Sequence, residues 1–436
     1  MRVGETTMYH VLKRLLIATL LTVSIPALAK AQGMELPDGE GKELVQASCV
    51  RCHETTLIAG STGYTHEQWG NLISKMIDLP DPLASGITQY LGTNFPQKNT
   101  RHPTLIAGDT KITFMEWAVP TLGQRPRDPL MTPDGMIWWA GMFGDIVGRL
   151  NPETGEMKEC PLETGTYPHS IINDVSGNIW YTGNHNGTVG MVNPDTCELT
   201  VYPMPDPAAR DPHTPIFTRN GDLWFTLQNS HMIGRLVPDT GDIRLAPTPT
   251  EGARPYGIEE DSKGMIWIAY RGAPKIARVD PDSWEIQEFD TPNPDPASHP
   301  GNHYIRRLSI SSDDMIWYVD SGRGYIGRLN PETGEIKEWM TPSGPTSHPY
   351  AIETIDDIVW FNESHQRPDA LVRFDPKTEE FQSWAIPSGI GVIRNMRGTP
   401  NGDLVIHQSS TNTVGLVRIA SHQESTIGAV PFSALP

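Results

Sequence analysis

One stretch of sequence returns seven times between residues 134 and 420, and this repeat constrains the fold more than any other feature. The copies include "DGMIWWAGMFGDIVGRLNPETGE", "SGNIWYTGNHNGTVGMVNPDTCE" and "DDMIWYVDSGRGYIGRLNPETGE". Within each copy, short segments alternate apolar and polar residues and are separated by Gly, Pro and Asn. A repeat of about forty residues with four short strands per copy predicts a β-propeller, and seven copies predict seven blades.

A tryptophan marks the same place in six copies of the repeat, and Val405 occupies it in the seventh. We expect these large apolar side chains to pack one blade on the next rather than to form a site. The tryptophans are Trp138, Trp180, Trp224, Trp267, Trp317 and Trp360.

The first copy of the repeat is preceded by an extra strand and the last copy is one strand short, which predicts how the ring of blades closes. The last copy lacks an outer strand. The segment "KITFMEWAVPT", which starts at Lys111, resembles the outer strands "GEIKEWMTPSG" and "EEFQSWAIPSG". We expect it to complete the last blade, because closure removes exposed sheet edges. The sequence thus predicts an all-β seven-bladed propeller over 111–420 and a tail over 421–436.

The first 31 residues have the pattern of a signal peptide. Lys13 and Arg14 precede an apolar run from Leu15 to Ala29, and small residues for cleavage lie at 27–31. We expect export to the periplasm and no transmembrane anchor after cleavage. Because that compartment permits disulfides, Cys160 and Cys197 could form one between neighbouring blades, or they could be two buried thiols.

The net charge limits the partners of the chain. Its 34 Lys and Arg residues face 52 Asp and Glu residues, which gives a net charge of -18. Such a surface repels nucleic acid, so no nucleic-acid partner is expected.

Residues 35–96 have helical periodicity and contain the motif Cys49-Val50-Arg51-Cys52-His53. A redox dithiol would need a βαβ setting, and zinc would need a second pair of ligands, and this segment offers neither. Both cysteines can instead bind one haem covalently, with His53 as the proximal iron ligand. The haem would also fill a core that three short helices cannot complete alone.

The sixth iron ligand should be a thioether or a second imidazole. Met76, at the end of the helix that starts after Thr65, is the expected ligand, and His66 in the first turn of that helix is its rival. A buried core methionine is the plainer interpretation of Met76. The segment resembles small class I-like cytochrome c domains over about residues 35–95. The resulting fold is multidomain: an all-α cytochrome c-like domain at 35–96, a linker at 97–110 and the propeller.

Counting twelve residues back from each tryptophan, and from Val405, reaches a proline in several blades, with Pro349 one position off. The residue after this position is large and polar in every blade. Because the innermost strands of a propeller surround a channel, we expect these side chains to line a funnel for a small anionic or carbonyl-bearing ligand. A water-filled structural channel is the alternative. The seven residues are Arg127, His169, His213, Tyr256, Arg306, Tyr350 and Arg394.

A second set of polar residues lies three positions after the tryptophans and includes Asp320 and Glu363 in adjacent blades. His365 follows Glu363 by two, so both side chains point to one face of a strand. Glu363 and His365 could hold a divalent ion or act as a base and acid pair. Ordinary polar loop residues are the alternative.

The stretches "LWFTLQNSHMIGRL" and "VWFNESHQRPDALVRF" resemble the virginiamycin B lyase (streptogramin lyase) propellers, and the similarity covers about 111–420. The resemblance implies a seven-bladed propeller that opens a cyclic depsipeptide by elimination, with Mg²⁺, a Glu-x-His pair and a histidine in the preceding blade. Glu363 and His365 match the pair. The matching stretch of the preceding blade, from Asp320 to Arg323, contains no histidine, and Asp320 is the candidate to replace it as a catalytic residue.

Three functions follow from these patterns. The first is a haem protein that transfers electrons between a ligand in the channel and a periplasmic electron carrier or redox enzyme. The second is a Mg²⁺-dependent carbon–oxygen lyase with a separate haem. The third is a non-enzymatic propeller that docks a redox partner. Because elimination needs no electrons, the haem motif favours the first.

Overall fold

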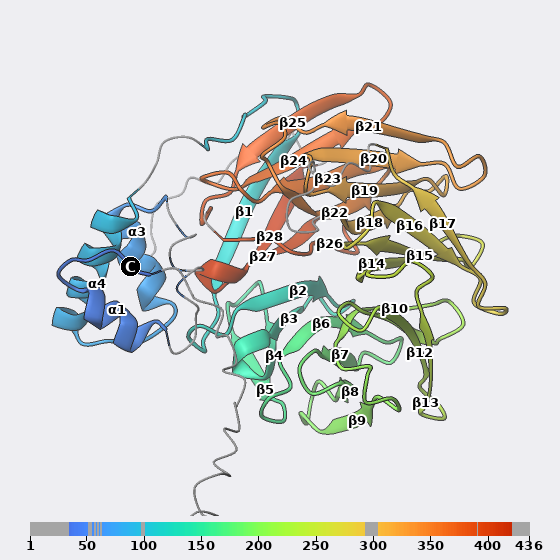
Figure 1. Cartoon of the computed structure of the whole chain (residues 1–436), viewed down its shortest axis with the longest axis horizontal. Coiled ribbons are helices and arrows are strands. Elements are labelled where there is room, and N and C mark those ends of the chain that lie inside the picture. The colour runs from blue at the N-terminus through green and yellow to red at the C-terminus, as the bar shows by residue number, and fades with distance from the viewer. Residues whose placement is uncertain are drawn as a thin grey trace, which may run out of the picture.

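A computed structural model describes residues 35–50, 55, 58, 61, 63–96, 101–292, 304–389 and 391–420. In it, a group of helices lies beside a ring of β-sheets (Figure 1). The predicted signal peptide, Cys52, His53 and the tail over 421–436 fall outside the described residues. Within the described ranges, no helix is long and apolar enough to cross a membrane.

Three helices are bounded in the N-terminal helical region (residues 35–96): α1 (Lys42–Ser48), α3 (His66–Ser74) and α4 (Asp81–Asn94). Helix α3 begins with a capping box. Thr65 Oγ1 accepts a hydrogen bond from Gln68 N at 3.2 Å, and Gln68 Oε1 accepts one from Thr65 N at 2.9 Å. Because α3 ends at Ser74, Met76 lies just beyond the helix rather than at its end.

The helices share a small apolar core. Val45 of α1, Trp69 and Leu72 of α3, and Tyr90 and Leu91 of α4 are all buried in it. This cluster is separate from the apolar clusters of the β-sheets. The helical region therefore has a core of its own, and Met76 packs against it.

Seven four-stranded sheets make up the rest of the described chain, and each sheet is antiparallel. This arrangement confirms the predicted seven-bladed propeller. The first three sheets comprise β2 (Pro126–Met131), β3 (Ile137–Gly141), β4 (Ile146–Leu150) and β5 (Met157–Pro161); β6 (Pro168–Asn173), β7 (Ile179–Gly183), β8 (Thr188–Val192) and β9 (Leu199–Pro203); and β10 (Pro212–Phe217), β11 (Leu223–Leu227), β12 (Met232–Val237) and β13 (Asp242–Pro247). The next three comprise β14 (Pro255–Glu260), β15 (Ile266–Tyr270), β16 (Lys275–Val279) and β17 (Ile286–Asp290); β18 (Ile305–Ile310), β19 (Ile316–Asp320), β20 (Tyr325–Leu329) and β21 (Ile336–Met340); and β22 (Pro349–Ile355), β23 (Ile358–Glu363), β24 (Ala370–Asp375) and β25 (Glu380–Ala385).

The last sheet joins the two ends of the propeller. Its order is β1 (Lys111–Ala118), β28 (Thr413–Ala420), β27 (Leu404–Gln408) and β26 (Arg397–Gly398). Strand β1 runs antiparallel to β28, with Lys111 opposite Ala420 and Ala118 opposite Thr413. The N-terminal strand is thus the outer strand of the last blade, and Figure 1 shows it beside β28.

The repeated tryptophans pack between blades. Trp224 of β11, for example, is fully buried in one cluster with Ile258 and Ile268 of the next sheet. Its five counterparts are also buried. Burial of such large apolar side chains stabilises each interface by roughly 2–3 kcal/mol per side chain.

The innermost strands of the first six sheets each contain a shift in register. In β10 it lies between Pro212 and Pro215, and β2, β6, β14, β18 and β22 have a shift at the matching place. Such a bulge re-aims the local side chains, so two successive residues can face the propeller axis. His213 and Thr214 do so in β10, and this geometry builds the channel.

The sequence left open whether Cys160 and Cys197 form a disulfide or are two buried thiols. Cys160 at the end of β5 and Cys197 before β9 form a disulfide with their Cα atoms 5.4 Å apart. It joins the first two blades at their outer strands.

Candidate functional site

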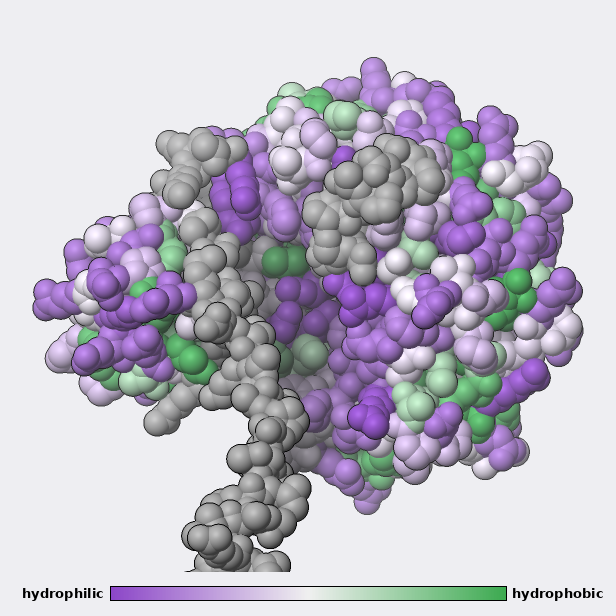
Figure 2. Space-filling view, in the orientation of Figure 1, coloured by the Kyte–Doolittle hydropathy of each residue, from purple (hydrophilic) through white to green (hydrophobic). Residues whose placement is uncertain are grey.

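The seven predicted channel residues meet around the propeller axis, and we call them the channel ring: Arg127, His169, His213, Tyr256, Arg306, Tyr350 and Arg394. The rings of His169 and His213 lie 3.5 Å apart between centroids, and those of His213 and Tyr256 lie 4.2 Å apart. All seven except Arg394 are buried. Figure 2 shows a hollow between the helical region and the propeller, in which both hydrophilic and hydrophobic residues are visible.

Positive charge exceeds negative charge in the channel ring, which contains three arginines and no carboxylate. Arg127 is 4% exposed, and its Nε has no hydrogen-bond partner among the described residues. Burial, together with the charge of Arg127, lowers the pKa of Arg394. Buried guanidinium groups in this setting favour a ligand that brings negative charge.

An ion pair between two blades lies next to the ring. Arg307 donates through one terminal nitrogen to Asp128 Oδ2 at 2.8 Å and through the other to Thr214 Oγ1 at 3.1 Å. Its Nε donates to the carbonyl of Arg394 at 3.1 Å. Burial opposes the charge of Asp128, but Arg307 and Arg127 lower its pKa. The carboxylate of Asp128 thus offsets part of the positive charge of Arg307 and of Arg127 in the ring.

The two neighbouring histidines of the ring, His169 and His213, favour the neutral form. Burial and then the nearby arginines lower the pKa values of His169 and His213 well below the usual range. His169 Nδ1 has no partner within the described part of the chain. A neutral imidazole with a free nitrogen can hydrogen-bond a ligand carbonyl or hydroxyl.

Two tyrosines of the channel ring share a short hydrogen bond. The phenol oxygens of Tyr256 and Tyr350 lie 2.5 Å apart. The guanidinium carbon of Arg306 lies 4.1 Å from the ring centroid of Tyr350, and that of Arg394 lies 5.9 Å from it. Burial opposes ionisation of Tyr350, but Arg306, Arg394 and Arg127 lower its pKa to about 7. Burial and the neighbouring Tyr350 raise the pKa of Tyr256.

Glu363, predicted as a catalytic residue or ion ligand, binds a neighbouring loop. One of its carboxylate oxygens accepts a hydrogen bond from Ser343 N at 2.8 Å, and the other accepts one from the Ser343 hydroxyl. Burial raises the pKa of Glu363. Glu116 makes the same pair of bonds to Ser388, and Glu288 makes it to Thr250. We call this two-bond contact a carboxylate clasp, and its recurrence favours a structural role for Glu363.

Asp320 also lies inside a structural network. Its Oδ2 accepts a hydrogen bond from Arg323 Nε at 2.8 Å, and its Oδ1 accepts bonds from Gly322 N and Arg323 N. Arg323 binds Glu338 as well. These bonds fix the loop between β19 and β20.

His365 stands apart from the carboxylate of Glu363 and stacks instead on His348. Their centroids are 4.0 Å apart with an interplanar angle of 9°. Burial, and then Arg101, Arg367 and Arg306, lower the pKa of His365 to about 4. In the described ranges, no three His, Cys, Asp or Glu side chains form a group that could hold a metal ion. The structure therefore does not bring Glu363, His365 and Asp320 into one cluster.

A second cavity, of about 480 Å³, lies between the helical region and the propeller. On the helical side it is lined by Cys49, Met76 and apolar residues such as Trp69 and Leu91. On the propeller side it is lined by Arg125, Phe143, Tyr167 and Arg394, among others. Because Arg394 also belongs to the channel ring, the cavity borders the channel.

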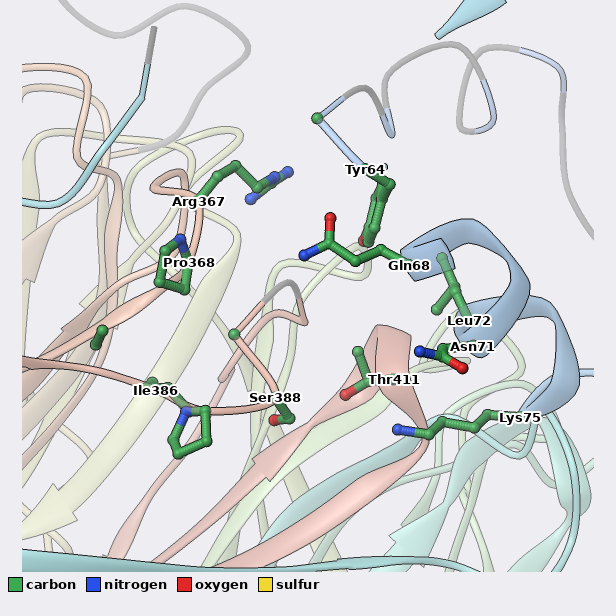
Figure 3. Close-up of a pocket in the computed structure, with 14 residues that line it drawn as sticks. Tyr64, Gln68, Asn71, Leu72, Lys75, Arg367, Pro368, Ile386, Ser388 and Thr411 are labelled. Carbon is green, nitrogen blue, oxygen red and sulfur yellow. The ribbon is translucent and has the colours of Figure 1, made fainter. Parts of the chain in front are cut away.

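Another hollow separates the two regions farther along α3. Gln68, Asn71 and Lys75 face Arg367, Ser388 and Thr411 across it (Figure 3). Its volume is also about 480 Å³, and its lining is more polar. Near this hollow, the backbones of the propeller and the helical region are in contact: Gly123 N donates a hydrogen bond to the carbonyl of Lys75 at 2.9 Å.

Several residues of the site were not predicted from the sequence. Arg125 lies two residues before Arg127 and faces the cavity; burial, Arg394 and Arg127 lower its pKa to about 8. Arg307 and His348 are neighbours of ring positions in the sequence. The bulge in β18 turns Arg307 toward the channel, but a bulge can be recognised only when the register of the paired strands is known.

The comparisons with known proteins concern the propeller. The sequence model of the Virginiamycin B lyase family matches residues 102–300. No curated protein matches the chain. Among solved structures, virginiamycin B lyase from Staphylococcus aureus is 23% identical, with a TM-score of 0.62 over 70% of this chain and 99% of that one.

Two further structures give the same result. A streptogramin B lyase is 22% identical, with a TM-score of 0.63 over 71% of this chain and 98% of that one. A catalytically inactive variant of the Staphylococcus aureus enzyme, with quinupristin, is 23% identical, with a TM-score of 0.61. The propeller is therefore virginiamycin B lyase-like, and these likenesses cover about 70% of the chain.

Proposed function

We propose that this chain is an exported c-type haem protein in which the helical region carries one covalent haem and the channel ring binds a small anionic or carbonyl-bearing ligand. The haem supplies one-electron transfer, and a periplasmic carrier or redox enzyme exchanges the electrons. The cavity shared by Cys49, Met76 and the propeller is the single observation that carries this proposal.

The residues around this cavity fit a haem. Cys49 and Cys52 would hold it covalently, His53 would be its proximal ligand and Met76 its sixth ligand. The apolar residues of α3 and α4 suit the macrocycle, while Arg125 and Arg394 suit its two carboxylates. The helical core is small, as expected if a large group completes it.

The position of the cavity supports a functional link between haem and channel. Arg394 lines both the cavity and the ring, so a charged group in either place acts on the other. The disulfide between Cys160 and Cys197 supports export, because such bonds persist in oxidising compartments.

The test is an absorption spectrum of the full chain purified from a periplasm. We expect the pyridine derivative of the reduced protein to have the bands of a covalent haem c, and the oxidised protein to have a methionine–iron charge-transfer band. Met76→Ala should lose the second signal and keep the first. Met340→Ala, which alters an exposed methionine of the propeller, is the control. A purified chain without covalent haem would contradict the proposal.

Electron transfer is tested separately by stopped flow. Small carboxylates with an oxidisable hydroxyl, and reduced periplasmic carriers, are mixed with the oxidised protein while the haem band is followed. Reduction by a ligand that Arg127→Gln slows would place the ligand in the channel. If no ligand or carrier reduces the haem, the electron-transfer function is wrong even where the haem is present.

A lyase reaction is the second candidate, favoured by the match to the Virginiamycin B lyase family over 102–300 and by the paired rings of His348 and His365. In this proposal a divalent ion such as Mg²⁺ takes part, and His365 rather than Glu363 is the available base, since Glu363 is held by Ser343. The measurement is ring opening of quinupristin with Mg²⁺ by the wild type and His365→Ala. An inactive wild type eliminates this candidate.

A further inference from the structure

The channel ring contains a source of negative charge that is internal to the protein. Tyr256 comes from β14 and Tyr350 from β22, and each ring is at least 94% buried. Their oxygens lie within hydrogen-bond distance, 2.5 Å apart, so one phenol can donate to the other. If one of them loses its proton, the other remains as its donor.

The surroundings of the pair explain why a phenolate is stable there. Positive groups face it from several sheets, whereas Asp128, the carboxylate that acts on the ring, is bound to Arg307. The neighbouring titratable and charged groups are Arg127 of β2, Arg306 and Arg307 of β18, Arg394, Arg125, Arg271, His213 of β10 and His348. Arg307 lies 5.2 Å from the ring of Tyr256. Because Asp128 offsets only part of this positive charge, a phenolate offsets more of it.

We propose that the channel ring binds a carboxylate- or other oxyanion-bearing ligand in exchange for the negative charge of the Tyr256–Tyr350 pair, which takes up one proton from solvent as the ligand binds. This inference rests on the anion-binding part of the proposed function. The ligand anion replaces the phenolate as the partner of Arg127, Arg306 and Arg394. The protonated Tyr350 then becomes a hydrogen-bond donor.

The exchange has a pH signature that the other channel groups do not share. The pKa of Tyr350 lies near 7, whereas burial and nearby cations hold those of His169 and His213 well below the usual range. Above pH 7 the free ring holds a phenolate, and the complex holds one more proton. Affinity for an anion should therefore fall as pH rises, by about tenfold per unit.

Sulfate is a suitable probe because it does not titrate in this range. We would follow the near-ultraviolet tyrosinate absorbance of the full chain at pH 8, with and without sodium sulfate at matched ionic strength. We expect about one tyrosinate per chain, lost on addition of sulfate. Calorimetry in buffers of different ionisation enthalpy should give uptake of about one proton per bound sulfate.

Variants separate the pair from other tyrosines. In Tyr350→Phe, the tyrosinate signal at pH 8 should be absent, and sulfate affinity should be constant between pH 8 and 9. Tyr181→Phe alters a buried tyrosine of β7 outside the ring and should behave as the wild type. Arg127→Gln should weaken sulfate binding at least tenfold, which locates the probe in the ring.

The outcomes are distinct. Sulfate binding without proton uptake, or a wild type without tyrosinate below pH 9, overturns the exchange and leaves the anion site intact. A wild type that binds no sulfate contradicts both the exchange and the proposed channel ligand. The haem spectrum is independent of either result.

Discussion

Carboxylate side chains of this propeller hold loops in place, and Glu363 is one of them. Its two oxygens accept both hydrogen-bond donors of Ser343, as those of Glu116 do for Ser388. Glu363 is fully buried, so removing its carboxylate leaves the donors of Ser343 without an acceptor.

Glu363→Ala should lower the free energy of unfolding by about 2–4 kcal/mol, because it combines an unsatisfied buried hydroxyl and amide with a cavity. Urea unfolding of the purified variant measures the loss. Glu116→Ala is the matched control, and we expect a smaller loss, since Glu116 is only partly buried. An unchanged or increased stability of Glu363→Ala would indicate a carboxylate kept for catalysis instead of for the clasp.

The channel ring was predictable at the residue scale because it depends on a repeat. Counting from a tryptophan located all seven side chains, and the structure brings them together. The same count could not tell Glu363 and Asp320 from catalytic residues, because Ser343 and Arg323 are partners created by loop geometry. The spacing of residues in the sequence predicts which face of a strand a side chain lies on, but it does not predict which loop that side chain contacts.

At the scale of elements, the repeated strands and the closing strand follow from alternation and from the similarity of outer strands. The bulges do not, and they decide which side chains reach the axis. Strict alternation would send Arg306 and Arg307 to opposite faces, yet both reach the channel. The ion pair between Arg307 and Asp128 could therefore not be predicted from the sequence.

The disulfide between Cys160 and Cys197 links two blades that also pack through an apolar cluster. The cysteines are 37 residues apart, so the bond restricts a sizeable loop of the unfolded chain. We expect Cys160→Ser/Cys197→Ser to lower the free energy of unfolding by about 2–4 kcal/mol. Urea titrations with and without dithiothreitol check this.

Reductant provides the control for that experiment. Dithiothreitol should destabilise the wild type by about as much as the double substitution does, and it should leave the variant unchanged. Equal stability of variant and oxidised wild type would mean that interface packing alone holds the two blades together.

At the scale of the whole molecule, the question is whether the helical region is docked on the propeller or only tethered to it. Gly123 N donates to the carbonyl of Lys75, and a Cβ atom at Gly123 would lie 2.8 Å from the carbonyl oxygen of Met76. The backbone next to the proposed iron ligand thus rests directly on the propeller. Docking would fix the cavity, and with it the relation between the proposed haem and the channel ring.

Gly123→Ala should weaken this docking. Gly123 has a φ of +67°, and Gly135, in an open turn with a φ of +83°, has nothing within 4 Å of the position of a Cβ. Both substitutions carry the strain of a left-handed residue, about 1 kcal/mol, but only the first also presses on Met76. The difference between the two variants therefore isolates the contact between helical region and propeller.

Trypsin cleavage after Lys75 reports this difference, because the carbonyl of Lys75 is bound to Gly123 N in docked molecules and cleavage follows the population of undocked ones. An added loss of about 1 kcal/mol in docking raises that population about fivefold, so Gly123→Ala should be cut about five times faster than Gly135→Ala. If the haem is present, the methionine–iron band should weaken in Gly123→Ala alone. Equal cleavage of both variants would mean that the helical region is only tethered, and then the shared cavity could not couple Met76 to Arg394.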